Sequence, residues 1–259
     1  MPNMRSPWTY ALAAALLMLG APAGMASAEP VAAQASTPMT GVNEAIRSEL
    51  DDPDGLLGVL VMQMPDLRAG IEARLRLAID SQGIMGLQDE AFRLGWEYGQ
   101  RYIMRFADAA DGEALLNFMT GMESILTKMH AAGPVKCFNW MFGGEPLDIE
   151  QSGITVDDVK AINDAMVAVI RTGAKGSPVP ADKDTAALVS QVATRAFVAA
   201  KGYESGWPLL GNPHAASNDH DKAGICTDVK ALYSEILALP KDQAVAVTRV
   251  LFASDTPSR

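Results

Sequence analysis

The stretch from Leu87 to Asp108 constrains the fold of this chain more than any other segment. At about 100° per residue, its apolar side chains fall on two adjoining stripes of a helix, and charged side chains occupy the remaining arc. The stripes comprise Phe92, Trp96, Gly99, Ile103 and Phe106, and Leu87, Ala91, Leu94, Gly95, Tyr98 and Tyr102. A helix that is apolar around so much of its girth packs against several neighbours. We therefore expect residues 87–108 to form the central buried helix of an all-α domain.

Capping residues and apolar periodicity predict further helices along the chain, about eight in all. Asp111 and Thr155 precede apolar-periodic segments, as N-cap residues do, and Gly133-Pro134 ends the first of these segments. Other segments at helical spacing begin near Gly41, Gly55, Pro65, Lys183, Thr227 and Pro240. The sequence shows no strand ladder and no internal repeat. These features predict a multi-helix globular domain.

The N-terminus has the three-part layout of a secretory signal peptide. An apolar run at 11–19 follows Arg5, and the small residues at 26–28 offer a cleavage site after Ala28. The apolar run is shorter than the roughly 20 residues that a membrane span needs. An uncleaved anchor is the alternative. We expect a periplasmic or secreted mature protein without a membrane span.

The remaining chain divides into a short leader, one large helical domain and a tail. Residues 29–38 are small and polar, which is typical of disorder, and residues 254–259 form the tail. The helical domain is expected at 39–253. The segment KGSPVPAD carries the strongest linker composition, so a sub-boundary near 173–183 is the alternative to a single domain.

The charge balance excludes some classes of partner. The chain is acidic, with a formal net charge of −10, and has no cluster of Lys or Arg. Nucleic acids and anionic membranes attract basic surfaces, so neither is an expected partner. A protein partner in the envelope remains compatible with this charge, as does plain solubility.

Two cysteines, Cys137 and Cys226, are present in a chain that the signal peptide directs to an oxidising compartment. We predict one disulfide between them, with two unpaired buried thiols as the alternative. Each cysteine lies in a segment without clear periodicity, at 132–153 and at 202–226, and we expect both segments to be long loops. The disulfide would hold the two loops together.

The same two segments contain aromatic side chains that are candidates for an interaction surface. These are Phe138, Trp140, Phe142 and Trp207. Aromatic residues on a tethered surface are typical of protein-recognition sites. The alternative is that they plug the end of the helical core.

His214, Asp219, His220 and Asp221 form the densest set of metal-ligating side chains in the sequence. Zinc hydrolases hold three protein ligands in fixed geometry, often with two histidines on one helix. A loop of this length between two histidines gives no such rigidity, so a polar surface loop is the favoured interpretation. We expect no bound metal and no cofactor.

Several methionines could serve as copper ligands, but they have a simpler explanation. Met62, Met64 and Met85, and the pair Met119 and Met122, offer soft ligands for copper(I), but methionine is a common core filler.

Glu90 and Glu97 lie seven residues apart and could form a pair of catalytic carboxylates. Arg93 and Arg101 lie beside them, so a solvated row of ion pairs is the favoured interpretation.

The composition and the absence of a catalytic motif favour an exported binding or interaction protein of the bacterial cell envelope, without evident catalysis. Residues 154–170, the Pro-containing linker after them and a helix ending at Ala196-Phe197 form a layout that resembles small helical periplasmic immunity proteins of type VI secretion. That resemblance implies an immunity or inhibitor role. The cysteine placement differs, so no family is assigned. A metal-dependent hydrolase using 214–221 and a periplasmic copper(I)-binding protein are the alternatives.

Overall fold

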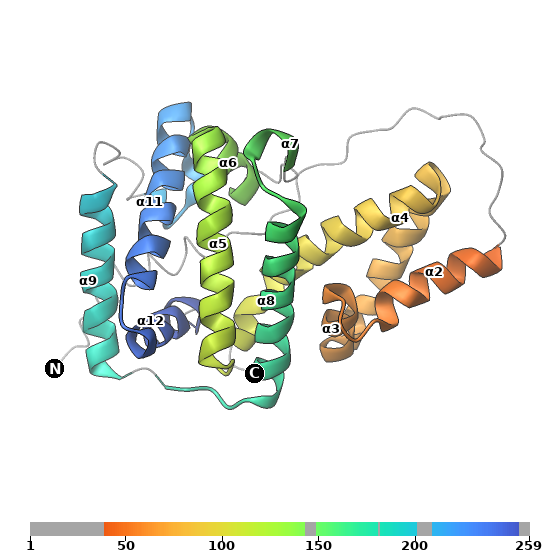
Figure 1. Ribbon diagram of the computed structural model, residues 1–259, viewed down its shortest axis with the longest axis horizontal. Coiled ribbons are helices and arrows are strands. Elements are labelled where there is room, and N and C mark those ends of the chain that lie inside the picture. The colour runs from red at the N-terminus through yellow and green to blue at the C-terminus, as the bar shows by residue number, and fades with distance from the viewer. Residues whose placement is uncertain (1–38, 143–148, 181, 201–208, 254–259) are drawn as a thin grey trace. The chain divides into compact units, whose positions relative to one another are not determined.

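The computed structural model describes residues 39–142, 149–180, 182–200 and 209–253. Their regular secondary structure is helical throughout, and these ranges contain no strand (Figure 1), which confirms the predicted all-α class. The signal peptide, the leader and the tail lie outside the described residues. No helix in the described ranges is both long and apolar enough to cross a membrane.

The chain forms two compact units that meet in sequence between Tyr102 and Ile103. In the described residues, the N-terminal unit comprises 39–102 and the C-terminal unit comprises everything from 103 onward. The segment expected as a sub-boundary, 173–183, lies inside the C-terminal unit, between two of its helices.

The N-terminal unit consists of short helices packed against a folded-back long one. Its elements are α2 (Met39–Asp51), α3 (Leu56–Gln63), the 3-10 helix η1 (Pro65–Leu67) and the part of α4 (Arg68–Ala107) up to Tyr102. Apolar side chains from all three α-helices form one core. It contains Val42, Ile46, Leu50, Leu57, Val61, Ile71, Leu75, Ile79, Leu87, Ala91 and Leu94.

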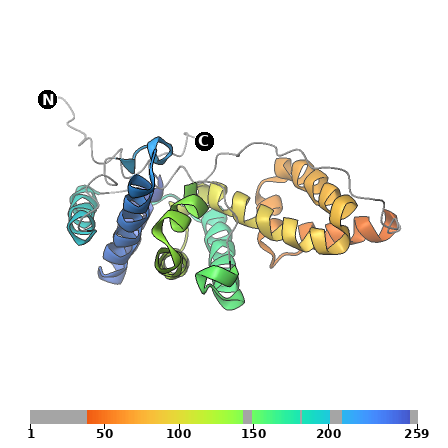
Figure 2. The same ribbon diagram turned by 90° about the horizontal axis from the view of Figure 1, so that it is seen from above.

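Helix α4 folds back on itself at Gly83, which gives it a first arm at 68–82 and a second arm at 84–102 (Figure 2). Gly83 is the residue inside α4 whose backbone is non-helical, with φ 69° and ψ −158°. That region of backbone conformation is open almost only to glycine. A Cβ at Gly86 would lie 2.6 Å from the carbonyl oxygen of Ala78, so the arms also need glycine there. The corner is thus built on two glycines.

The helix predicted at 87–108 is present as the later part of α4, and it ends at Ala107. Leu94 is fully buried in the core of the N-terminal unit, and Ile103 is buried in the C-terminal unit. One helix therefore supplies core side chains to two separate units.

The C-terminal unit is organised around α5, which packs against α6, α7, α8, α11 and α12. Helix α9 packs against α11 and α12 at the side of the unit away from α8 (Figure 1). The bounds are α5 (Gly112–Ala132), α6 (Pro134–Phe142), α7 (Ile149–Ser152), α8 (Val156–Lys175), α9 (Lys183–Ala199), η2 (Pro213–Ala215), α11 (Asp219–Leu237) and α12 (Lys241–Ala253).

The predicted caps begin two of these helices. The Asp111 carboxylate accepts hydrogen bonds from the backbone N–H groups of Glu113 and Ala114, at 2.8 and 3.3 Å. Thr155 and Asp158 form a reciprocal capping box at the start of α8. Both helices begin where the cap chemistry places them.

The two segments expected to be long loops contain helices instead. Residues 134–142 and 149–152 are helical, and α11 begins at Asp219, eight residues before the start expected at Thr227. Asn218 caps α11 by accepting a hydrogen bond from the backbone N–H of Asp221 at 2.9 Å. Thr227 therefore lies within the helix and not at its end.

Candidate functional site

The predicted disulfide joins α6 to α11. Cys137 and Cys226 are bonded, with their Cα atoms 6.0 Å apart, and they lie 89 positions apart in sequence. Both are fully buried, where the two helices pack against each other. In the chain-entropy model, a bond that closes a ring of this size stabilises the folded state by roughly 4 kcal/mol.

The aromatic side chains next to Cys137 lie in the core of the C-terminal unit. Phe138, Trp140 and Phe142 are 5, 4 and 6% exposed. The rings of Phe138 and Phe142 contact each other, with centroids 5.3 Å apart. Trp207 lies outside the described residues. The three described aromatics therefore stabilise the packing of α6 and offer no exposed recognition surface, which agrees with the plug alternative.

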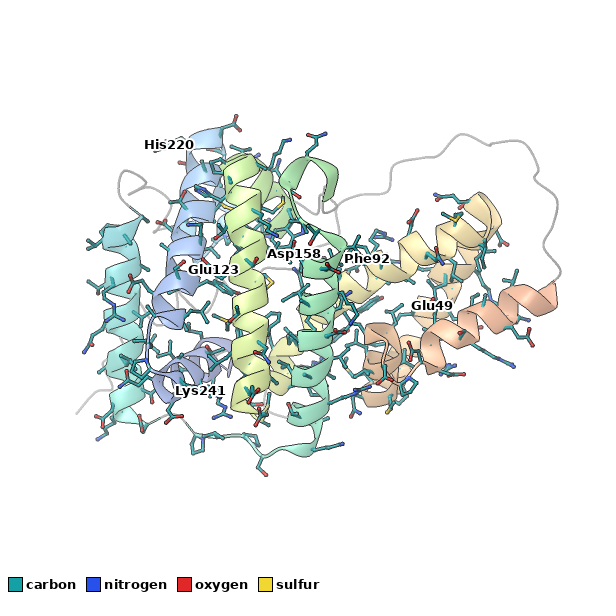
Figure 3. All side chains as sticks on the ribbon, viewed as in Figure 1. Glu49, Phe92, Glu123, Asp158, His220 and Lys241 are labelled. Carbon is teal, nitrogen blue, oxygen red and sulfur yellow. A yellow bond between two sulfur atoms is a disulfide. The ribbon has the colours of Figure 1, made fainter. Side chains whose placement is uncertain are left out.

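The histidines and aspartates at 214–221 lie on two separate elements. His214 lies in η2, and Asp219, His220 and Asp221 form the first turn of α11, where Figure 3 labels His220. Acidic residues in a first turn interact favourably with the helix dipole. The described residues contain no group of three or more His, Cys, Asp or Glu side chains placed to hold a metal ion.

The methionines divide into buried and exposed ones. Met119 and Met122 are buried on α5 and belong to the core of the C-terminal unit. Met62, at the end of α3, and Met85, just after the corner of α4, have exposed side chains. The pair at 119 and 122 is therefore core packing, as expected for methionine at helical spacing.

Glu90 and Glu97 on the second arm of α4 bind an arginine from the first arm. Arg74 donates to Glu90 at 3.0 Å through Nε and to Glu97 at 3.1 Å through both terminal nitrogens. Arg93 also donates to Glu90, at 2.6 and 2.8 Å. The two carboxylates and Arg74 are only 15 to 29% exposed, so the pairs are partly shielded from water.

These contacts show that the carboxylates accept hydrogen bonds from guanidinium groups and hold the two arms together. We call Arg74, Glu90 and Glu97 the arm clamp. The predicted row of ion pairs along the second arm is present, but Arg74, which binds both carboxylates, comes from the first arm. Helical periodicity within one segment carries no information about a partner that lies 16 and 23 residues away.

Asp228 is a buried acid that the sequence analysis missed. Its side chain is 0% exposed, and neither carboxyl oxygen has a hydrogen-bond partner among the described residues. Burial raises the pKa of Asp228 to about 7. The sequence carried a signal, because Asp228 falls among Ile225, Val229 and Leu232 on the inward face of α11. An acid in such a pattern is expected to be protonated or paired.

His130 connects the end of α5 to the middle of α11. Its Nε2 lies 3.0 Å from Oγ1 of Thr227, and that hydroxyl donates to the carbonyl of Ala223 at 2.8 Å. Because the hydroxyl has one hydrogen, it accepts from the Nε2–H of His130. Burial, and then the charge of Lys230, lower the pKa of His130. His130 therefore links the end of α5 to α11 through this hydrogen bond, and its lowered pKa favours the neutral imidazole.

A second polar bridge joins the same two helices. Ser234 on α11 donates to the Glu123 carboxylate on α5 at 3.0 Å, and Figure 3 labels Glu123 on the side of α5 that faces α11. Thr127 donates to the same carboxylate from one turn further along α5. Together with the disulfide, these bridges connect α5, α6 and α11 through side chains as well as through packing.

The corner of α4 exposes large apolar side chains in the N-terminal unit. Leu77, Ile84 and Met85 are 68, 54 and 66% exposed, and all lie within six residues of Gly83. Exposed polar side chains surround them in sequence, at Asp80, Gln82, Gln88 and Asp89. Large apolar side chains left exposed among polar ones are a usual feature of protein-contact surfaces. We call Leu77, Ile84 and Met85 the corner surface.

Comparison with known proteins adds no relative. No protein-family model, no curated protein and no solved structure matches this chain.

Proposed function

We propose that this chain is an exported, non-catalytic binding protein of the cell envelope that contacts a protein partner through the corner surface. The observation that carries the proposal is the exposure of Leu77, Ile84 and Met85 at one corner. Exposing such side chains to water is unfavourable, since each would gain about 1.5–3 kcal/mol from full burial. A protein partner would supply that burial.

The backbone at the corner of α4 is held in place, which suits a contact surface. Gly83 and Gly86 fix the turn, and the arm clamp holds the two arms at the positions that present the corner. A preformed surface loses less conformational entropy on binding than a mobile one. The acidic charge of the chain favours a partner with a basic rim. An immunity or inhibitor role, in which the chain covers a toxin or enzyme, is one form of such binding.

The experiment compares capture of envelope proteins by the wild-type chain and by two double variants. Leu77→Ser with Met85→Ser removes the corner surface, and Val156→Ser with Val198→Ser removes two exposed apolar side chains from the C-terminal unit as a matched control. We expect a captured protein to be lost from the corner variant and retained by the control, as measured by mass spectrometry of the eluates. Equal capture by all three chains, or no capture by the wild type, would contradict the proposal.

A further inference from the structure

The exposed thioether of Met85 is open to chemistry from which the core methionines are protected. Met62 and Met85 are 58 and 66% exposed, and Met64 is half-buried. The other methionines whose exposure the structure describes are at most 8% exposed: Met104, Met119, Met122, Met129, Met141 and Met166. Oxidation of a thioether requires the oxidant to touch the sulfur, so exposed methionines react first. Met62 and Met85 are therefore the sites in this set that an oxidant reaches most readily.

The sequence around Met85 leaves its sulfur open and determines which oxidants suit the site. The next residue, Gly86, has no side chain to cover the sulfur. One helical turn further along, Gln88 and Asp89 are exposed and polar. Between residues 77 and 89 the chain has two acids and no Lys or Arg. Negative charge repels anionic oxidants and does not affect neutral ones, so the suitable class is a neutral peroxide such as hydrogen peroxide.

Oxidation would change Met85 from an apolar side chain into a polar one. The sulfur attacks one oxygen of hydrogen peroxide, an S–O bond forms as the O–O bond breaks, and water leaves. The sulfur loses two electrons and the peroxide gains them. The new sulfoxide oxygen accepts hydrogen bonds, so its burial in an apolar contact is unfavourable. A sulfoxide at this position would therefore oppose contact between the corner surface and an apolar surface of a partner.

The fold of the N-terminal unit does not depend on the side chain of Met85. Met85 is not one of the residues that form the apolar core of this unit. The corner is built on the backbone geometry of Gly83 and Gly86. Oxidation of Met119 or Met122, by contrast, would place a polar group in the core of the C-terminal unit. Oxidation at Met85 therefore changes a surface and leaves the fold in place.

We propose that Met85 is a reversible oxidation site at which a neutral peroxide converts the corner surface from apolar to polar. The inference rests on the proposed function, because the surface that it changes is the one proposed to contact a partner. The supporting observations are the exposed thioether, its place in the corner surface and a corner backbone that does not need it. In the reverse reaction, two thiols of a reductant become a disulfide, and the sulfoxide oxygen leaves as water.

The first test measures which methionines hydrogen peroxide oxidises in the folded chain. Peptide mass spectrometry would follow the oxidation of each methionine with time. We expect Met62 and Met85 to oxidise at least about tenfold faster than Met119 and Met122, because buried sulfurs react only when the structure opens locally. The same treatment in urea should remove this difference. A Met85 that oxidises as slowly as the two buried methionines would overturn the inference.

The second test measures the polarity of the corner surface, with Met62 as the matched control. Met62→Leu leaves Met85 as the highly exposed thioether, and Met85→Leu leaves Met62, while each variant keeps an apolar side chain of similar size. Retention on a hydrophobic interaction column is compared with the untreated form of each chain. We expect peroxide to reduce retention more in Met62→Leu than in Met85→Leu, because Met85 lies beside further exposed apolar side chains.

Methionine sulfoxide reductases for both sulfoxide epimers should then restore the retention of the Met62→Leu chain. Equal losses of retention in the two variants would overturn the inference. A loss that the reductases do not reverse would also overturn it, because the proposed site is reversible.

A third measurement separates the inference from the proposed function. The capture of envelope proteins is repeated with both leucine variants, each compared before and after peroxide treatment. We expect oxidation to reduce the capture of a partner by Met62→Leu at least about fivefold and to change capture by Met85→Leu less. If the first two tests succeed and no chain captures a protein, the proposed function is wrong and the oxidation site stands. If oxidation leaves an established capture by Met62→Leu unchanged, the inference is wrong and the proposed function stands.

Discussion

The two units of this chain hold their helices together by different means. In the C-terminal unit, a buried disulfide and bridges through His130 and Glu123 join α5, α6 and α11. In the N-terminal unit, the arms of α4 are joined by an apolar core, the partly exposed arm clamp and a glycine corner, with no covalent bond. The comparison indicates that the C-terminal unit is held by a covalent bond in addition to packing, whereas the N-terminal unit depends on packing and ion pairs alone.

The largest expected effect tests the covalent bond of the C-terminal unit. Replacing Cys137 and Cys226 with alanine should lower the free energy of unfolding of the C-terminal unit by roughly 4 kcal/mol, because the unfolded chain is no longer constrained by the ring. Urea denaturation with hydrogen exchange read separately for each unit would measure this. Exchange in the N-terminal unit, within 39–102, should be unchanged. Equal losses in both units would contradict the division between them.

The buried acid of the C-terminal unit should make its stability depend on pH. The folded pKa of Asp228 is about 7, above the unfolded value of 3.8, so the folded state binds the proton more tightly. The free energy of unfolding therefore falls as pH rises from the unfolded pKa to the folded pKa. The expected loss is about 3 kcal/mol between about pH 5 and pH 8. Asp228→Asn should remove that slope in urea titrations. The exposed Asp242→Asn on α12 is the control and should retain it.

Removal of the arm clamp should loosen the N-terminal unit more modestly. Arg74→Met should lower its free energy of unfolding by about 1–2 kcal/mol, since the pairs are charge-assisted but reached by solvent. The loss should shrink at high salt, because ions screen partly exposed pairs. Lys160→Met, which breaks the exposed Lys160–Asp164 pair on α8, should leave the free energy of unfolding nearly unchanged. Equal losses of unfolding free energy in the two variants would contradict a structural role of the arm clamp.

The smallest expected effect concerns the start of α8. Thr155→Ala should cost about 1 kcal/mol through loss of the capping box. The same site adds an acid dependence, because hydrogen bonds from Lys128 and Thr155 lower the pKa of Asp158 to about 2. A lowered pKa means that this stabilisation is present above the unfolded value of 3.8 and is lost as pH falls through about 2. Thr120→Ala, in the exposed middle of α5, is the control and should have little effect.

Local signals predicted the elements whose cause is local. Asp111 and Thr155 begin their helices because a side chain satisfies N–H groups two or three residues away, which a sequence shows directly. The disulfide was predictable because only two cysteines are available.

Features that depend on distant neighbours were not predictable from the same signals. Helix α6 is nine residues long, which is too short to be stable alone, and it exists because it packs against α5 and α11. Its aromatics therefore became core side chains where the sequence suggested a loop. Arg74 finds its acceptors across the corner. Asp228 is buried by the helices packed around it and has no hydrogen-bond partner among the residues that the structure describes. These properties belong to the packing and not to a window of sequence.

The ring closed by Cys137 and Cys226 also sets an order of events during synthesis. Cys226 lies on α11, so the bond can form only after most of the chain has emerged. The core of the N-terminal unit draws all its side chains from residues 42–98 and can assemble while α11 is still to come. The N-terminal unit can thus be complete first, and the C-terminal unit is locked only once α11 reaches Cys137.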